Sequence, residues 1–264
     1  MTMKELSDKK RWEVFYKDKN LNIFSLINSV VNNFFKKELK KVFEDFIPHQ
    51  GGLSLIELGC GNSDWLPYFC SKYRYEVYGV EYLNHACQLA EQKLKLNGCK
   101  SYQVYCGDFF ELHKTIHFKF NILVSFGVVE HFDNLEYVIK ISSYYLNKGG
   151  FIITVCPNTK GLAMSLQKYI DYKIYKSHKL FDLEYLIKCH KTNGYKIIFA
   201  DYIEYESLNN LDFSNYGKIG KIVKMIIKLW NLPFVYTMFK LKKCFQLPLK
   251  NQLSATMVVI AQKL

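Results

Sequence analysis

The chain has 264 residues, 49% hydrophobic and 16% aromatic, enough for one α/β domain with a sizeable core. No run of about 18 apolar residues occurs and the N-terminus is charged, so we expect no spanning helix, no signal peptide, and a protein that is cytoplasmic or peripheral at the membrane. The net charge of +12 favours anionic partners, although only two of the 36 basic residues are arginines, the side chain that nucleic-acid readers prefer.

The first 49 residues are expected to form a helical segment ahead of the core. Residues 24–46 combine apolar residues and lysines in a run that predicts one helix or a pair of helices. From residue 50 onward the pattern changes to short apolar runs, so the core is predicted to begin there.

Strand-like and helix-like runs then alternate, which is typical of a doubly wound parallel sheet. The predicted strands are 53–58, 75–82, 100–108, 120–127, 150–158, the end of 180–205, and 253–264. The predicted helices between them are 85–98, 135–150 and the start of 180–205. The sequence thus predicts a Rossmann-like α/β fold with a seven-stranded, mostly parallel sheet and helices on both faces.

We predict a single domain over 1–264. Its core is expected to comprise 50–207 and 252–264, with 1–49 as an N-terminal helical cap and 208–251 as a helical insertion on the substrate side. No internal repeat or low-complexity linker divides the chain.

The turn after the first strand reads ELGCGNS and holds two glycines, Gly59 and Gly61. Glycine lets the backbone approach a ligand at the carboxyl end of a strand, where doubly wound sheets bind their ligands. Asp64 stands where the dinucleotide fingerprint GxGxxG has its third glycine, and no GxxxxGK[ST] loop is present. The pattern therefore favours neither a dinucleotide nor a triphosphate.

Acids follow at the ends of the next two predicted strands. Glu81 comes twenty residues after Gly61, where an acid accepts hydrogen bonds from a ribose diol. Asp108 ends the third strand, and Phe109 beside it could pack on an adenine ring. SFGVVEHF, at 125–132, closes the fourth strand with an acid–imidazole pair. Together these tips predict a cofactor that contains adenosine.

With these motifs in this order, the chain resembles the class I S-adenosylmethionine-dependent methyltransferases. It is most similar to their small-molecule group, which includes quinone-biosynthesis-like enzymes. The resemblance covers about residues 50–160 and extends weakly to 178–195. It implies S-adenosylmethionine as the cofactor and a small molecule as the methyl acceptor.

The resemblance also implies a role for each residue at the strand tips. Residues implied to contact or border the methionine half are Glu57, Gly59, Cys60, Gly61, Ser125 and Phe126. Glu57 would order the amino group directly or through water, and the three turn residues would contribute backbone contacts. Residues implied to hold the adenosine half are Glu81, Tyr82, Asp108 and Phe109.

His131 is the candidate catalytic base, because an imidazole can accept a proton near neutral pH. A structural role, holding the loop by a hydrogen bond, is the open alternative. Some quinone-type relatives carry ExxEH at this place, which suggests a metal, but Gly127 occupies the first acidic position here. We therefore predict no metal. His178, Asn158 and Tyr16 are weaker candidates for contact with the substrate.

The variable segments around the core leave further alternatives open. Trp12 and Tyr16 could form a lid over the cofactor or anchor the first helix, and Arg11 could pair with an anionic group of the substrate. Residues 218–245 predict a basic amphipathic helix broken near Pro233. We expect its apolar face to roof the active site, with peripheral contact to an anionic membrane as the alternative.

The eight cysteines show no CxxC pair and no zinc-ligand spacing, so we expect reduced thiols. The predicted activity is methyl transfer to an oxygen of an anionic, lipid-linked or saccharide-linked metabolite. A nucleic-acid methyltransferase is one alternative, but no [DN]PP[YF] motif occurs and Cys156 precedes Pro157 rather than following a proline. A non-catalytic protein that binds the same cofactor is the other alternative.

Overall fold

This computed structural model describes residues 5–17, 36–203, 208, 211–242 and 250–264. Seven strands form one sheet: β1 (Ser54–Leu58), β2 (Glu76–Glu81), β3 (Tyr102–Cys106), β4 (Phe120–Phe126), β5 (Leu146–Pro157), β6 (Tyr195–Ile203) and β7 (Thr256–Lys263). Their order is β3-β2-β1-β4-β5-β7-β6. Only β7 runs antiparallel to its neighbours, β5 and β6, which confirms the predicted Rossmann-like, mostly parallel sheet.

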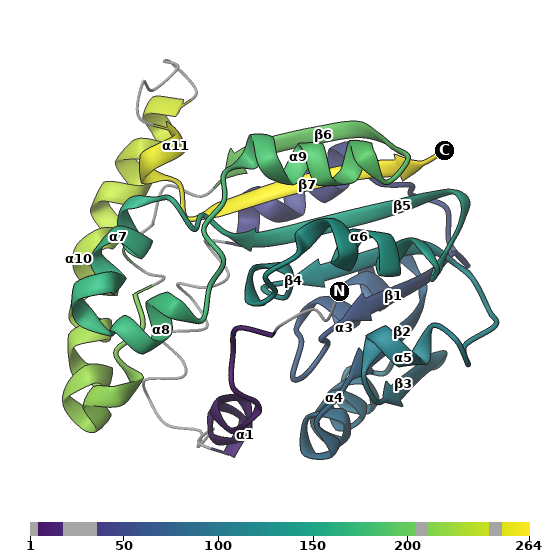
Figure 1. The fold of residues 1–264 in the computed structure, drawn as a ribbon, viewed down its shortest axis with the longest axis horizontal. Helices are drawn as coiled ribbons and strands as arrows, with labels where there is room; N and C mark the ends of the chain where they lie inside the picture. The colour runs from purple at the N-terminus through teal and green to yellow at the C-terminus, as the bar shows by residue number, and fades with distance from the viewer. Residues whose placement is uncertain (1–4, 18–35, 204–207, 209–210, 243–249) are drawn as a thin grey trace.

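Helices cover both faces of this sheet (Figure 1). One face packs against α5 (Phe109–Leu112), α6 (Leu135–Ser143) and α9 (Leu183–Thr192). The other packs against a helix over 36–46, α3 (Trp65–Tyr73) and α4 (Asn84–Leu96). Successive residues of β4 alternate between the two cores, because side chains of a strand point to opposite faces.

The remaining helical elements are α1 (Lys9–Lys17), η1 (Val129–His131), α7 (Leu162–Ile170), α8 (Tyr172–Lys176), η3 (Ser214–Tyr216), α10 (Gly217–Lys242) and α11 (Lys250–Leu253). Of these, α7, α8, α10 and α11 stand together at one end of the sheet in Figure 1. The Tyr216 hydroxyl donates a hydrogen bond to the carbonyl of Ile170 at 2.8 Å, which ties η3 and the start of α10 to α7. Among the described residues, no helix has the length and apolar character that a bilayer crossing requires.

Two predicted boundaries differ from the structure. The helix predicted over 135–150 ends at Ser143, and β5 already begins at Leu146. The glycine pair 149–150 therefore lies inside the strand rather than after the helix. Of the helix predicted over 24–46, residues 24–35 lie outside the described residues.

The predicted orientation of the inserted helix is wrong for the described side chains of α10. Ile219, Ile226 and Trp230 are 71%, 56% and 84% exposed, so this apolar side faces solvent and not the site. Gly220 is buried instead, against the backbone and Cβ of Phe213. Because only glycine permits this close approach, the packing at Gly220 decides which side of α10 turns inward. Lys224, one turn further on, lies on that inner side.

The expectation of reduced cysteines is wrong for one pair. Cys87, on α4, and Cys106, the last residue of β3, form a disulfide with a Cα–Cα distance of 6.1 Å. They are 19 residues apart in sequence, and the packing of α4 against β2 and β3 brings them together. The other described cysteines, Cys60, Cys70, Cys99, Cys156 and Cys189, are free thiols. Cys244 lies outside the described residues.

Candidate active site

A cavity of about 860 Å³ opens at the carboxyl ends of β1, β2, β3 and β4. Seven of the predicted site residues line it: Gly59, Glu81, Tyr82, Asp108, Phe109, Phe126 and His131. Its opposite wall comes from the N-terminal segment, with Ser7, Arg11 and Trp12. The parallel strands place their tips at one edge, which is why residues from four separate motifs meet here.

Glu81 organises the turn at the first strand. Its Oε2 accepts a hydrogen bond from the Gly61 amide at 3.0 Å, and its Oε1 accepts from the amides of Tyr82 and Leu83 at 2.9 and 3.0 Å. Burial raises the pKa of this carboxyl, and the three amides oppose that rise. A carboxylate has about four lone-pair positions, so Oε2 keeps one for a ligand.

The predicted backbone contacts of the glycine turn cannot come from free N–H groups. The amides of Gly59 and Cys60 both donate to the Val80 carbonyl, at 2.8 and 3.0 Å, and the Gly61 amide is held by Glu81. Gly59 has φ +68°, and a Cβ there would lie 2.7 Å from the Val128 side chain. This glycine is therefore required by packing against Val128 as well as by its conformation.

Four predicted cofactor residues do not line the cavity: Glu57, Cys60, Gly61 and Ser125. Glu57 is only 2% exposed, and burial raises its pKa to about 8 despite a hydrogen bond from Ser63 and the nearby charge of Lys93. Its Oε2 has no hydrogen-bond partner among the described residues. Cys60 packs beneath Gly79, and Ser125 is buried in β4.

The third strand tip offers an exposed acid and two neighbouring phenylalanine rings. Asp108 caps α5 by accepting a hydrogen bond from the Phe110 amide at 2.9 Å, and its carboxylate stays exposed at the cavity edge. The rings of Phe109 and Phe110 lie 3.9 Å apart, and Phe110 stacks on Tyr137. The buried Tyr145 hydroxyl donates to the Phe109 carbonyl at 2.5 Å, which fixes the start of α5.

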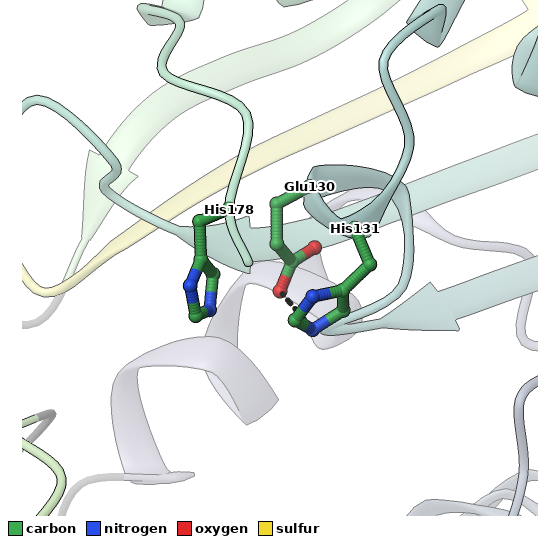
Figure 2. A group of neighbouring side chains, drawn as sticks. All are labelled: Glu130, His131 and His178. Atoms are coloured by element: carbon green, nitrogen blue, oxygen red, sulfur yellow. Dashed lines mark ion pairs between the residues drawn. The ribbon is translucent and has the colours of Figure 1, made fainter. Parts of the chain in front are cut away.

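Three buried or half-buried side chains converge at the other end of the cavity: Glu130, His131 and His178 (Figure 2). One ligand atom from each lies within 4.8 Å of the others. His131 Nδ1 is 2.9 Å from the Ser177 carbonyl, and His178 Nδ1 is 2.7 Å from the Ile174 carbonyl. Because a carbonyl oxygen only accepts, each imidazole carries its proton on Nδ1 and has a lone pair on Nε2.

Burial also fixes the charges of this cluster. It lowers the pKa of His131 to about 3, with further lowering from His178 and Arg11, and it lowers the pKa of His178. Burial raises the pKa of Glu130 to about 8. All three groups are therefore neutral near pH 7. Such a cluster can accept a proton from a hydroxyl at His131 Nε2, and two imidazoles with a carboxyl are also a donor set for a divalent metal.

The N-terminal segment is held against this cluster. The Leu6 amide donates to the His131 carbonyl at 2.7 Å, and the Trp12 ring meets the His131 imidazole edge-on with centroids 5.2 Å apart. Arg11 donates to the Ser177 hydroxyl at 2.6 Å and pairs with Asp212 at 3.3 Å. Residues 5–12 thus form the wall of the cavity beside His131.

A family model described as "Methyltransferase domain" matches residues 28–199, well over half of the chain. The chain belongs to this methyltransferase family. No curated protein sequence matches it.

Solved structures with the same fold are similar to this methyltransferase at low identity. Phosphoethanolamine N-methyltransferase 2 of Haemonchus contortus superposes with a TM-score of 0.59 at 14% identity, covering 84% of this chain and 51% of its own. This chain thus spans about half the length of that protein. A SAM-dependent methyltransferase from Archaeoglobus fulgidus gives 0.57 at 18% identity, with 92% and 100% covered. Geranyl diphosphate C-methyltransferase from Streptomyces coelicolor A3(2) gives 0.59 at 10% identity, with 87% and 79% covered.

Several residues of the methyltransferase site had no separate prediction from the sequence. Phe110 and Phe132 lie inside the motifs CGDFF and SFGVVEHF, so their place in the cavity could have been read from those motifs. Tyr137 and Asp212 line the cavity without any such signal. Of the weaker substrate-side candidates, His178 lines the cavity, Asn158 lines a neighbouring one, and the Tyr16 side chain lies outside the description.

Proposed function

We propose that this methyltransferase transfers a methyl group from S-adenosylmethionine to an oxygen of a small, anionic metabolite. The observation that carries the proposal is one cavity that is lined both by the acids of the second and third strand tips, Glu81 and Asp108, and by His131. The membership of the quinone-biosynthesis-like group stays a prediction.

The residues of the cavity fit the adenosyl cofactor. Glu81 keeps an acceptor position for the ribose diol, Asp108 offers an exposed carboxylate to the adenine amino group, and the Phe109 ring stands beside it. Phe126, stacked on Trp65 at 4.9 Å, would border the methionine half. Glu57 is walled off from the cavity, so it would act on the amino group through water.

The cofactor supplies an already activated methyl group, so the protein has to align the acceptor and exclude water. Trp12 and the segment before it close one side of the cavity. His131 would accept a hydrogen bond from the acceptor hydroxyl at Nε2 and take its proton as the methyl group is transferred. Burial lowers the pKa of this imidazole, which leaves the Nε2 lone pair free near neutral pH and also makes His131 a weaker base than an exposed histidine.

Calorimetric titration with S-adenosylmethionine tests the cofactor assignment. Wild-type protein is expected to bind, Glu81→Ala to bind at least tenfold more weakly, and the exposed control Glu184→Ala to bind like the wild type. Labelled cofactor incubated with a metabolite extract should then yield a methylated small molecule, with bulk RNA as the competing acceptor. Absence of binding heat, or label in RNA alone, would end the proposal.

A second proposal concerns the membrane, and the exposed side of α10 favours it. Ile219, Ile222 and Trp230 are exposed there beside the lysines 218 and 221, and Tyr169 of α7 is 84% exposed. An apolar face with aromatic residues and flanking lysines suits an anionic bilayer surface. The wild-type protein should sediment with anionic vesicles, and the double variant Trp230→Ser, Ile219→Ser should stay in the supernatant. Equal sedimentation of both proteins, or sedimentation of the wild type with neutral vesicles, would contradict the membrane proposal.

A further inference from the structure

A second cavity, of about 250 Å³, shares Arg11, His178 and Asp212 with the first. Its other walls come from the end of β5, from α7 and α8, from α10, and from Ser254 and Ala255 just before β7. It therefore lies beyond His178 as seen from the strand tips. No predicted role for the cofactor uses this space.

The lining of this second cavity is positive. Two cations face it, Arg11 and Lys224, against one carboxylate, Asp212. Asp212 already pairs with Arg11 at 3.3 Å. Burial lowers the pKa of Lys224, and the nearby charge of Asp212 opposes that shift. Lys224 extends into a buried space while apolar residues of the same helix face solvent, and burying an ammonium group costs free energy unless its charge is balanced. Asp212 is shared between Arg11 and Lys224, so one positive charge among the described residues of this lining stays unbalanced.

Two buried polar atoms of residues in the lining have no hydrogen-bond partner among the described residues: Asn158 Oδ1 and Ser254 Oγ. Asn158 and Ser254 are 4% and 0% exposed. The Asn158 amide nitrogen donates to the carbonyls of Asn251 and Ser254, at 2.7 and 3.0 Å. These two bonds fix the orientation of the amide, so Oδ1 is the atom without a partner among the described residues. Buried polar atoms are normally paired, so these two suggest a polar ligand.

We propose that this second cavity binds an oxyanion, a phosphoryl or carboxyl group on the tail of the methyl acceptor, through Arg11 and Lys224. The Ser254 hydroxyl would donate to the same group, and Asn158 Oδ1 would accept from a neighbouring hydroxyl of the acceptor. The inference rests on the proposed function, because it places the reactive end of the acceptor at His131 and the anionic end past His178.

Inorganic phosphate and acetate are the two probes, titrated into the protein at constant ionic strength with S-adenosylhomocysteine present. Lys224→Met should weaken binding of the recognised anion about tenfold to a hundredfold, the loss expected for a charged hydrogen bond. Lys224→Arg should largely restore it. Lys218→Met, exposed on the same helix, should leave it unchanged. Tighter binding of phosphate than of acetate would identify the anionic group of the acceptor as a phosphoryl group. Tighter binding of acetate would identify it as a carboxyl group.

Failure of this inference can be distinguished from failure of the proposed function. Cofactor binding without binding of either anion would overturn the anion site and leave methyl transfer standing. Equal losses of anion affinity in Lys224→Met and Lys218→Met would also overturn the anion site, because the loss would then come from the lower net charge of the protein. Thermal unfolding of each variant shows whether it is folded. If Lys224→Met does not fold, anion binding by the Lys224→Arg protein still decides the test.

Discussion

Glu57 makes the stability of this protein depend on pH in a direction that can be measured. Its carboxyl is 2% exposed, and burial raises its pKa from 4.5 to about 8. Between these values the folded protein holds a proton at Glu57 that the unfolded chain has lost. The unfolded state therefore binds fewer protons, and the free energy of unfolding falls as pH rises through this window.

The size of the effect follows from the same shift. One such carboxyl contributes a slope of about −1.4 kcal/mol per pH unit, so stability falls by about 2 kcal/mol between pH 5.5 and 7 on account of Glu57. Glu57→Gln keeps the shape and removes the titration. The stability of this variant relative to the wild type should therefore rise by about 2 kcal/mol over that range.

Urea unfolding at four pH values from 5.5 to 7 measures this difference directly. Glu130, His131 and His190 also have shifted pKa values, but they are present in both proteins and cancel in the comparison. Glu184→Gln, exposed at the start of α9, is the matched control and should run parallel to the wild type. A Glu57→Gln curve that also runs parallel would refute the reasoning.

Three further predictions concern the site and its surroundings. His131→Asn should lower the single-turnover rate constant of methyl transfer about 10²- to 10⁴-fold with cofactor binding unchanged, and a matching loss of cofactor affinity would instead indicate a structural role. Dialysis against a chelator should leave the rate unchanged if His131 acts as a base without metal. Loss of the rate and its recovery with divalent ions would assign Glu130, His131 and His178 to a metal. Denatured protein should titrate two more thiols after reduction than before, from Cys87 and Cys106, and equal counts would exclude the disulfide.

The predicted sheet was confirmed because its signals are local. A strand such as LSLIEL and the glycine turn after it are specified by adjacent residues, and parallel pairing then brings the tips of β1, β2, β3 and β4 together. That is why Gly59, Glu81, Asp108 and His131 could be assigned to one edge of the sheet without coordinates. The start of β5 was misplaced because a glycine pair signals the end of a helix and also occurs inside strands.

Other features depend on contacts between residues far apart in sequence. His178 joins Glu130 and His131, from which it is 48 and 47 residues away in sequence, and only the path of the chain through α7 and α8 brings it there. The side of α10 that turns inward depends on Gly220 meeting Phe213, which the helical pattern does not encode.

The amino-acid sequence by itself determined the α/β fold, the cavity edge and the methyltransferase family, because strand patterns and turn glycines act over a few residues. Only the tertiary structure decided which side chains face the cavity, which cysteines pair, and that Lys224 and Arg11 line a second chamber. These depend on how segments pack in three dimensions, and a buried charge or an unpaired polar atom exists only once that packing has removed water.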